Sequence, residues 1–249
     1  MKATQLTILK KTLSFVLALA AVCIIPSCVN EPKNTTNGHE WVDLGLPSGT
    51  LWATCNVGAN SPEEYGNYYS WGETQPKVTY FWDTYRFGEG PESSPKLKKY
   101  NTDAQYGIVD NLTTLQPDDD AATANWGDGW RSPTDEEWKE LLDNCESTWT
   151  NLNGVVGLQF TGSNGNFIFL PAAGFYYDDV YDEKCDRFNS GRCGQYWSSM
   201  LDPHFNDSKY MSKFPLLASG ICFSEKDNVT GLAAFRQEGL SVRPVRMSK

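Results

Sequence analysis

The sequence predicts an α+β fold, a twisted antiparallel sheet with one or two helices and long loops. Three observations support this prediction. One segment, 134–145, has the cap and the periodicity of an amphipathic helix. Elsewhere, short apolar stretches alternate with Gly, Pro, Asn and Asp, a pattern typical of strands and turns. The aromatic content of 13%, with nine Trp, predicts one core built from large rings.

The predicted helix starts after Thr134, which we expect to be its N-cap. Glu137 stands at the third helical position, so that the two residues can form a capping box. Apolar residues then recur at helical spacing: Trp138, Leu141, Leu142 and Cys145. We therefore expect one face of the helix, including Trp138, to pack in the core rather than to bind a ligand.

Several later stretches predict strands. Residues 167–170 form an apolar run that ends at Pro171 and follows a turn-like segment. Further strands are expected near the C-terminus, at 195–199, 231–236 and 240–246. Residues 175–193 and 200–220 are expected to be long polar loops.

The first 27 residues predict a lipoprotein signal peptide. Their apolar run, 12–25, is shorter than the roughly 20 residues of a membrane-spanning helix. It leads into Ile25-Pro26-Ser27-Cys28, which resembles a lipobox and makes Cys28 the predicted site of lipid attachment. Cys23 fits less well as an acceptor because the bulky Val22 precedes it. An ordinary cleaved secretory signal is the alternative.

Residues 28–40 are polar and predict a flexible tether, with the domain occupying 41–249. Acyl chains on Cys28 would hold the protein on a membrane of the cell envelope through the lipid anchor alone. The formal charge of −10 becomes −13 when the signal lysines Lys2, Lys10 and Lys11 are removed. Because such an acidic domain repels phosphate backbones, we expect no nucleic-acid partner.

Eight segments occur in an order that resembles a known family. They are GLPSGTLWAT (45–54), NVGA (56–59), PEEYG (62–66), WGET (71–74), WGDGWRSPT (126–134), FLPAAG (169–174), YWSS (196–199) and SVRPV (241–245). Together they strongly resemble the Fibrobacter succinogenes major paralogous domain, which is widespread in lipoproteins of gut Bacteroidetes. The resemblance covers nearly all of 41–246 and implies an outer-membrane lipoprotein, with the leaflet left open.

That family resembles a branch of the C-type-lectin-like fold. Residues 130–138 and 241–246 are similar to the helix start and the final strand of formylglycine-generating enzymes, which share the fold. The resemblance implies a C-type-lectin-like domain whose long loops bind proteins or glycans. A fold does not by itself determine a function.

Residues for catalysis are scarce. The two histidines are His39, in the predicted tether, and His204, so that a Ser-His-Asp or Cys-His system would depend on His204. Ser93-Ser94-Pro95-Lys96 matches a Ser-x-x-Lys pattern, but Pro95 disrupts the helix which that chemistry uses. Cys222 lies where formylglycine-generating enzymes carry a cysteine pair, yet it has no close sequence partner. We therefore predict no catalytic residues.

Five cysteines remain beyond Cys23 and Cys28: Cys55, Cys145, Cys185, Cys193 and Cys222. Cys185 and Cys193 would close a short loop with a disulfide that stabilises by about 2.5 kcal/mol. Cys55 with Cys145 is a second pairing to consider. Unpaired buried thiols are the alternative for both pairs and for Cys222.

Two acidic clusters, 118–120 and 178–183, could offer oxygen ligands to calcium. Neither has the spacing of a known calcium loop, so we expect solvated surfaces and predict no cofactor. Aromatic residues in the loop after 174 are candidates for ligand binding, and we single out Tyr176, Tyr177 and Tyr181. Packing of these rings under their own loop is the alternative.

These observations favour a noncatalytic lipoprotein of the cell envelope whose lectin-like domain binds a glycan or protein ligand through its long loops. An enzyme is the first alternative, either carbohydrate-active, with two acids about 5–10 Å apart, or a redox protein using Cys222. A structural subunit of a surface or fimbrial assembly is the second.

Overall fold

Antiparallel strands dominate the protein, together with two short α-helices, which confirms the α+β class. The computed structural model describes residues 34–177, 187–202, 215–226 and 229–248, all of which belong to one compact unit, 34–249. Among these residues, no helix is long and apolar enough to cross a membrane.

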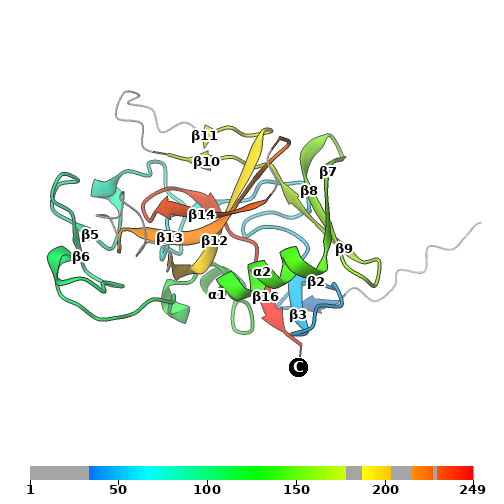
Figure 1. The fold of residues 1–249 in the computed structure, drawn as a ribbon, viewed down its shortest axis with the longest axis horizontal. Helices are drawn as coiled ribbons and strands as arrows, with labels where there is room; N and C mark the ends of the chain where they lie inside the picture. The colour runs from blue at the N-terminus through cyan, green and yellow to red at the C-terminus, as the bar shows by residue number, and fades with distance from the viewer. Residues whose placement is uncertain (1–33, 178–186, 203–214, 227–228, 249) are drawn as a thin grey trace, which may run out of the picture. The chain divides into compact units, whose positions relative to one another are not determined.

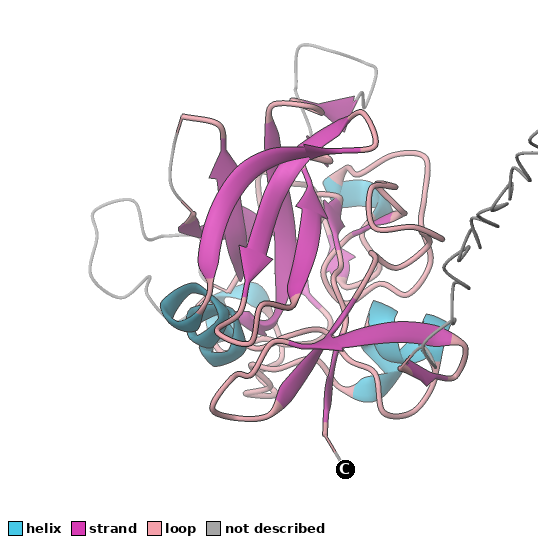
Figure 2. Ribbon diagram, turned by 90° about the vertical axis from the view of Figure 1, so that its right-hand side faces the viewer, coloured by secondary structure: helices cyan, strands magenta, loops and turns pink. Residues whose placement is uncertain are grey.

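The largest sheet has five strands in the order β14-β13-β12-β15-β4. Its members are β4 (Tyr68–Tyr69), β12 (Cys193–Leu201), β13 (Leu217–Ser224), β14 (Thr230–Phe235) and β15 (Leu240–Ser241). The three long strands β12, β13 and β14 are antiparallel neighbours (Figure 2), whereas β15 runs parallel to β12. Strands β12 and β14 contain two of the predicted segments, 195–199 and most of 231–236.

A second sheet joins the two ends of the described chain. It contains β1 (Thr35–Thr36), β2 (His39–Asp43), β3 (Thr50–Ala53) and β16 (Val245–Met247), in the order β1-β2-β3-β16. The single strand predicted over 240–246 is therefore wrong, because β15 and β16 belong to different sheets. Pro244 lies between them, and it cannot donate to a ladder hydrogen bond.

The structure also corrects the predicted tether of 28–40. Residues 34–40 belong to the folded unit, since β1 and β2 pair antiparallel and join the second sheet. The His39 ring stacks on Trp126 with the ring centroids 3.8 Å apart, and burial lowers the pKa of His39. Residues 28–33 lie outside the described residues.

Smaller sheets flank the five-stranded one. They are formed by β5 (Gly88–Glu89) with β6 (Lys96–Leu97), by β7 (Glu146–Leu152), β8 (Val155–Thr161) and β9 (Phe167–Pro171), and by β10 (Phe175–Tyr176) with β11 (Arg187–Phe188). Strand β9 confirms the predicted buried strand. The β5–β6 hairpin and the β7–β9 sheet lie on opposite sides of β12–β14 (Figure 1).

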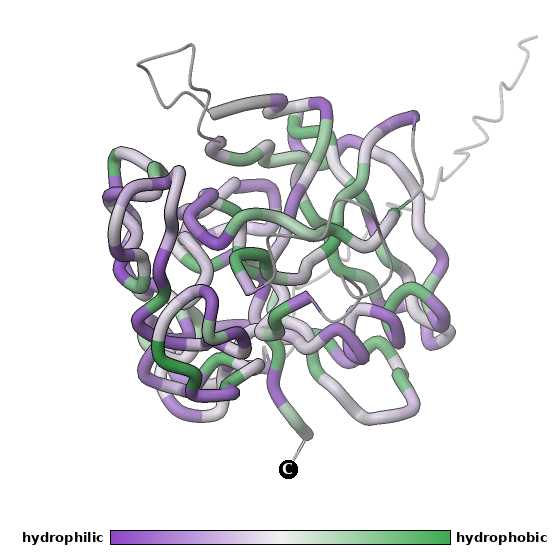
Figure 3. Tube along the Cα trace, turned by 60° about the vertical axis from the view of Figure 1, so that its left-hand side comes forward, coloured by the Kyte–Doolittle hydropathy of each residue, from purple (hydrophilic) through white to green (hydrophobic). Residues whose placement is uncertain are grey.

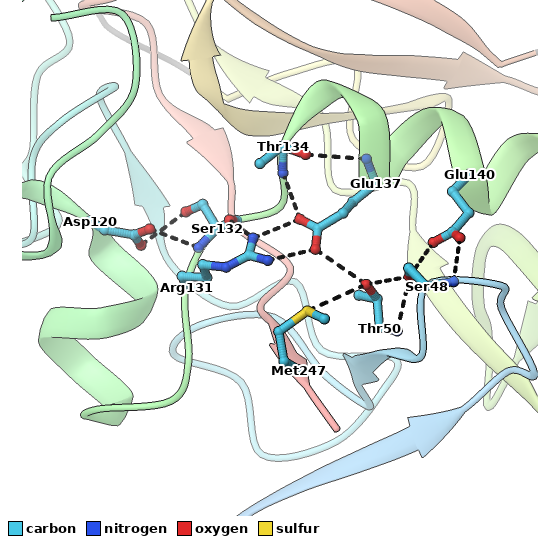
Figure 4. A network of polar contacts seen from close by, with 9 residues as sticks. All are labelled: Ser48, Thr50, Asp120, Arg131, Ser132, Thr134, Glu137, Glu140 and Met247. Carbon is cyan, nitrogen blue, oxygen red and sulfur yellow. Dashed lines mark hydrogen bonds and ion pairs between the residues drawn. The ribbon is translucent and has the colours of Figure 1, made fainter. Parts of the chain in front are cut away.

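The two α-helices, α1 (Ala121–Trp126) and α2 (Asp135–Asn144), are joined by one polar network (Figure 4). Helix α2 has the predicted capping box: the Thr134 hydroxyl accepts from the Glu137 amide, and the Glu137 carboxylate accepts from the Thr134 amide. Arg131 donates two hydrogen bonds of 2.6 Å to the same carboxylate, which also accepts from Thr50 of β3. Burial raises the pKa of Glu137, but these bonds outweigh it and lower the pKa overall.

The core consists of large rings, as predicted, but in place of the one core expected it forms two main clusters on the two faces of β12. One cluster contains Trp71, Tyr100, Trp130 and Trp197, and the other contains Trp52, Trp138, Tyr196 and Phe223. Trp138 is only 2% exposed, which confirms its packing role. Hydrophobic and hydrophilic stretches alternate over short distances along the trace (Figure 3).

Two buried arginines, Arg236 and Arg243, hold the C-terminal segment against distant parts of the chain. Arg243 donates to the Asn56 side chain and to the carbonyls of Ala53 and Phe169, at 2.9–3.0 Å. It is fully buried, and burial lowers the pKa of its guanidinium. Its three hydrogen bonds go to neutral oxygens.

Replacing Arg243 with Met tests how far the fold depends on this residue. Arg243→Met leaves the buried acceptors on Ala53, Asn56 and Phe169 without their donor, so we expect the free energy of unfolding to fall by at least about 3 kcal/mol. Denaturant unfolding of residues 34–249 measures the change. The exposed Arg192→Met is the control and should stay within about 0.5 kcal/mol. Equal effects of the two substitutions would contradict the assignment.

Candidate ligand-binding site

A pocket of about 350 Å³ opens between the loops that precede α1 and the ends of β13 and β14. Three regions far apart in the sequence line it. The first is η1 (Trp82–Thr84), the second is the β5–β6 connection together with η2 (Ala104–Tyr106), and the third comprises Leu216, Phe235 and Gln237. Its volume lies within the range of small-molecule sites.

Three rings form the apolar part of the pocket: Trp82, Tyr106 and Phe235. The Trp82 indole N–H donates to the Gly90 carbonyl at 3.0 Å, which fixes the ring under the β5–β6 hairpin. Tyr106 is placed by η2, whose N-cap, Asp103, accepts from the Gln105 amide. Trp82 and Tyr106 are each 4% exposed, so both rings are already packed into the walls of the pocket.

Polar groups line the opposite part of the pocket. Glu92, Ser93 and Ser94 come from the β5–β6 connection, Lys96 begins β6, and Gln105 comes from η2. The Lys96 ammonium donates to the Gln105 carbonyl at 2.6 Å, which ties the two loops together. The formal charges of Glu92 and Lys96 cancel, and burial followed by the Asp103 charge raises the pKa of Tyr106, so its phenol stays neutral. The lining therefore suits a neutral ligand.

Gln237 is the most informative residue of the pocket. It is 4% exposed, and its Oε1 is buried without a hydrogen-bond partner among the described residues. Its backbone is fixed, since its carbonyl accepts from the Ser70 hydroxyl at 2.7 Å. A buried acceptor left unpaired costs roughly 1–3 kcal/mol, a cost that is recovered when a donor arrives. A ligand with an O–H or N–H group that reached this oxygen would recover that cost.

Two of the predicted ligand-binding tyrosines, Tyr176 and Tyr177, do not line this pocket. The Tyr176 ring stacks on Tyr80 and meets Tyr68 edge-on, each with centroids 4.9 Å apart, so it packs against rings from an earlier part of the chain. Tyr177 is 45% exposed and lies beside Phe175. Tyr181 is outside the described residues. The pocket residues were not predicted to bind a ligand, although Phe235 lies in the predicted strand 231–236 and Ser93–Lys96 were considered as a catalytic motif.

The cysteines are placed as follows. Cys55 and Cys145 are free thiols that belong to different core clusters, so the Cys55–Cys145 bridge considered above is wrong. Cys193 is a buried free thiol whose pKa is raised to about 11 by burial and by Cys222, across the β12–β13 ladder. Cys185 lies outside the described residues, and its bridge to Cys193 stays a prediction.

The first acidic cluster serves the interior of the protein. Asp119 pairs with Arg86 and Lys99 and accepts from the Tyr100 hydroxyl. Asp120 caps α1 and accepts twice from Ser132 (Figure 4); burial raises its pKa, and these hydrogen bonds oppose the rise. The described residues contain no group of three or more His, Cys, Asp or Glu that could hold a metal ion. The cluster at 178–183 lies outside them.

Comparison with known protein families, with curated proteins and with solved structures finds no match for this chain.

Gln237→Leu tests whether the unpaired oxygen is an energetic cost. The substitution replaces a side chain whose acceptor is buried and unpaired with an apolar side chain of similar size. We therefore expect the free energy of unfolding without ligand to stay unchanged or to rise by up to about 1 kcal/mol. Gln195→Leu is a matched control, since Gln195 also buries an unpaired Oε1 but does not line the pocket. Destabilisation by Gln237→Leu but not by Gln195→Leu would mean that Gln237 has a purely structural role.

Proposed function

We propose that this chain is a noncatalytic lipoprotein of the cell envelope whose domain binds a neutral glycan in the pocket between η1, η2 and β14. The observation that carries the proposal is the buried Oε1 of Gln237 beside three aromatic rings. Sugars present hydroxyl donors at their edges, which suit this acceptor, and apolar C–H faces, for which the half-buried Phe235 offers the most exposed of the three rings.

The lining favours binding over glycoside hydrolysis. A glycosidase of the usual kind needs two carboxyl groups facing its substrate. Glu92 is the one acidic side chain among the described residues that line the pocket. A protein ligand would also find less support here, because a pocket of about 350 Å³ accepts a small group rather than a broad surface.

The proposal extends to fold and location. We propose a C-type-lectin-like domain of the Fibrobacter succinogenes major paralogous type, supported by the eight ordered segments, 45–245, and by the α+β class. We also propose acylation of Cys28 in the outer membrane, supported by the signal-like segment 1–27. The folded unit then begins at residue 34, which leaves a tether of about six residues between lipid and domain.

Glycan binding is tested with residues 34–249 on a glycan array, followed by calorimetric titration of the sugars retained. We expect Gln237→Leu to weaken binding more than about tenfold, because the ligand loses a buried hydrogen bond. Lys96→Ala should weaken it less, by a few-fold, since Lys96 holds the Gln105 loop. Lys226→Ala, exposed and outside the pocket, and Gln195→Leu are the controls. An affinity that is unchanged by both pocket substitutions, or cleavage of the bound sugar, would disprove the proposal.

Acylation is tested by expressing the full chain in a Gram-negative host supplied with an alkyne-labelled fatty acid. We expect label and membrane fractionation for the natural sequence, and the loss of both for Cys28→Ser, because the thiol of Cys28 is the proposed acceptor. Cys23→Ser should keep the label. A labelled Cys28→Ser protein, or an unlabelled natural one, would show that the lipid prediction is wrong.

A further inference from the structure

A second hollow, of about 690 Å³, lies between α2 and the strands β13 and β14. The wall from α2 presents residues spaced along one helical face: Asp135, Trp138, Lys139 and Leu142. The floor comes from β13 and β14, and Met200 and Asp202 close one end. We call this hollow the α2–β14 trough.

The trough exists because the sheet carries small residues where a helix would otherwise pack. In the β13–β14 ladder, Ser219 pairs with Ala233 and Ile221 pairs with Gly231, and residues opposite each other project from the same face. A side chain added at Gly231 would meet nothing within 4 Å. Helix α2 contacts β12 and β13, and the face of β14 beside it stays uncovered among the described residues.

Acidic residues dominate the polar part of the trough. Asp135, Glu136, Asp143 and Asp202 line it, against the single base Lys139, which already forms an ion pair with Asp143. Asp135 is held in place by hydrogen bonds with Ser198 and Ser219. Burial raises the pKa of Asp135, those hydrogen bonds oppose the rise, and the charges of Glu136 and Asp202 add to it. The trough therefore favours an incoming positive charge.

The apolar part of the trough and the strand edge indicate the shape of the partner. Leu142 and Leu232, both half-buried, offer aliphatic surface beside the buried Trp138 and Ile221. Strand β14 is the last strand of its sheet, and no other described strand pairs with its outer side. Such an edge presents free backbone donors and acceptors, to which an extended peptide can add as a further strand.

We propose that the α2–β14 trough binds an extended segment of a protein partner that carries aliphatic side chains together with lysine or arginine. The aliphatic groups fill the space above Gly231 and Ala233, the basic groups face Asp135 and Glu136, and the backbone pairs with β14. This site is separate from the glycan pocket, because the two linings share no residue.

The experiment uses residues 34–249 and two short acetylated peptides, one alternating lysine with leucine and the other alternating glutamate with leucine. Binding is followed by fluorescence anisotropy of the labelled peptide and by the amide chemical shift of Gly231. We expect the lysine peptide to bind, and Gly231→Trp to weaken it at least about tenfold by filling the trough. Glu136→Gln should weaken it a few-fold and reduce its salt dependence.

Two controls separate this result from unspecific attraction to an acidic protein. Val78→Trp adds the same ring at a position that is 88% exposed and outside the trough, and it should leave binding unchanged. The melting temperature of Gly231→Trp should equal or exceed that of the natural sequence, because the added ring enters open space.

Three results would overturn the proposal. Equal binding of the glutamate peptide would remove the role of charge, and lysine-peptide binding that survives Gly231→Trp would place the contact elsewhere. Self-association that Gly231→Trp abolishes would identify a second copy of this chain as the occupant. Loss of peptide binding together with unchanged glycan binding by Gly231→Trp would support the proposal and would separate the two sites.

Discussion

The fold depends above all on the burial of two guanidinium groups near the C-terminus. Arg236 is surrounded by rings, with its guanidinium carbon 4.9 Å from the Trp71 ring centroid, and it donates to the Tyr85 hydroxyl and to the carbonyls of Lys99, Tyr100 and Pro215. Arg243 likewise donates hydrogen bonds to the carbonyls of Ala53 and Phe169 and to the side chain of Asn56. A planar group with five donors in fixed directions can satisfy several loop carbonyls at once, which neither water nor lysine could do in this interior.

This arrangement explains how irregular loops can form a defined pocket. Tyr100 has a positive φ of 60°, an unfavourable conformation for a bulky residue, and it is held by Arg236 at its carbonyl and by Asp110 at its amide. The chain therefore leaves Tyr100 in a fixed direction toward η2 and the pocket residues Gln105 and Tyr106. On the opposite wall, Gln237 follows Arg236 directly. The same buried cation thus fixes both walls of the pocket.

The sequence predicted the elements whose causes are local. Helix α2 was predicted because its cap, its acidic first turn and its apolar face all lie within residues 134–145, and β9 was predicted from one apolar run. The β7–β8 hairpin also has a local signal in the sequence. Asn153-Gly154, both at positive φ, is a typical two-residue turn that predicts a hairpin. Helix α1 was missed because Asp120, its N-cap, was assigned to an exposed acidic cluster.

The pocket could not be predicted in this way, because its lining joins residues near 82, 96, 106, 216 and 237 that meet only through long-range contacts. Nothing local distinguishes Gln237 from any other glutamine; only the structure shows that its oxygen is buried and unpaired. Exposure is likewise a tertiary property: Tyr176 packs against Tyr68 and Tyr80, whereas Tyr177 is exposed, and ligand binding by these tyrosines stays a prediction.

Strand β14 shows how one element can serve two surfaces of opposite character. Its last residue, Phe235, helps to line the neutral pocket, while Gly231 and Ala233 form the floor of the acidic trough. The strand needs only its inner edge, paired with β13, to remain folded, so its outer edge and its small residues are not required by the core. Filling position 231 with a large apolar side chain would cover exposed apolar surface at little steric cost. A glycine at that position leaves this stabilisation unused, which is the pattern expected where open space serves binding rather than folding.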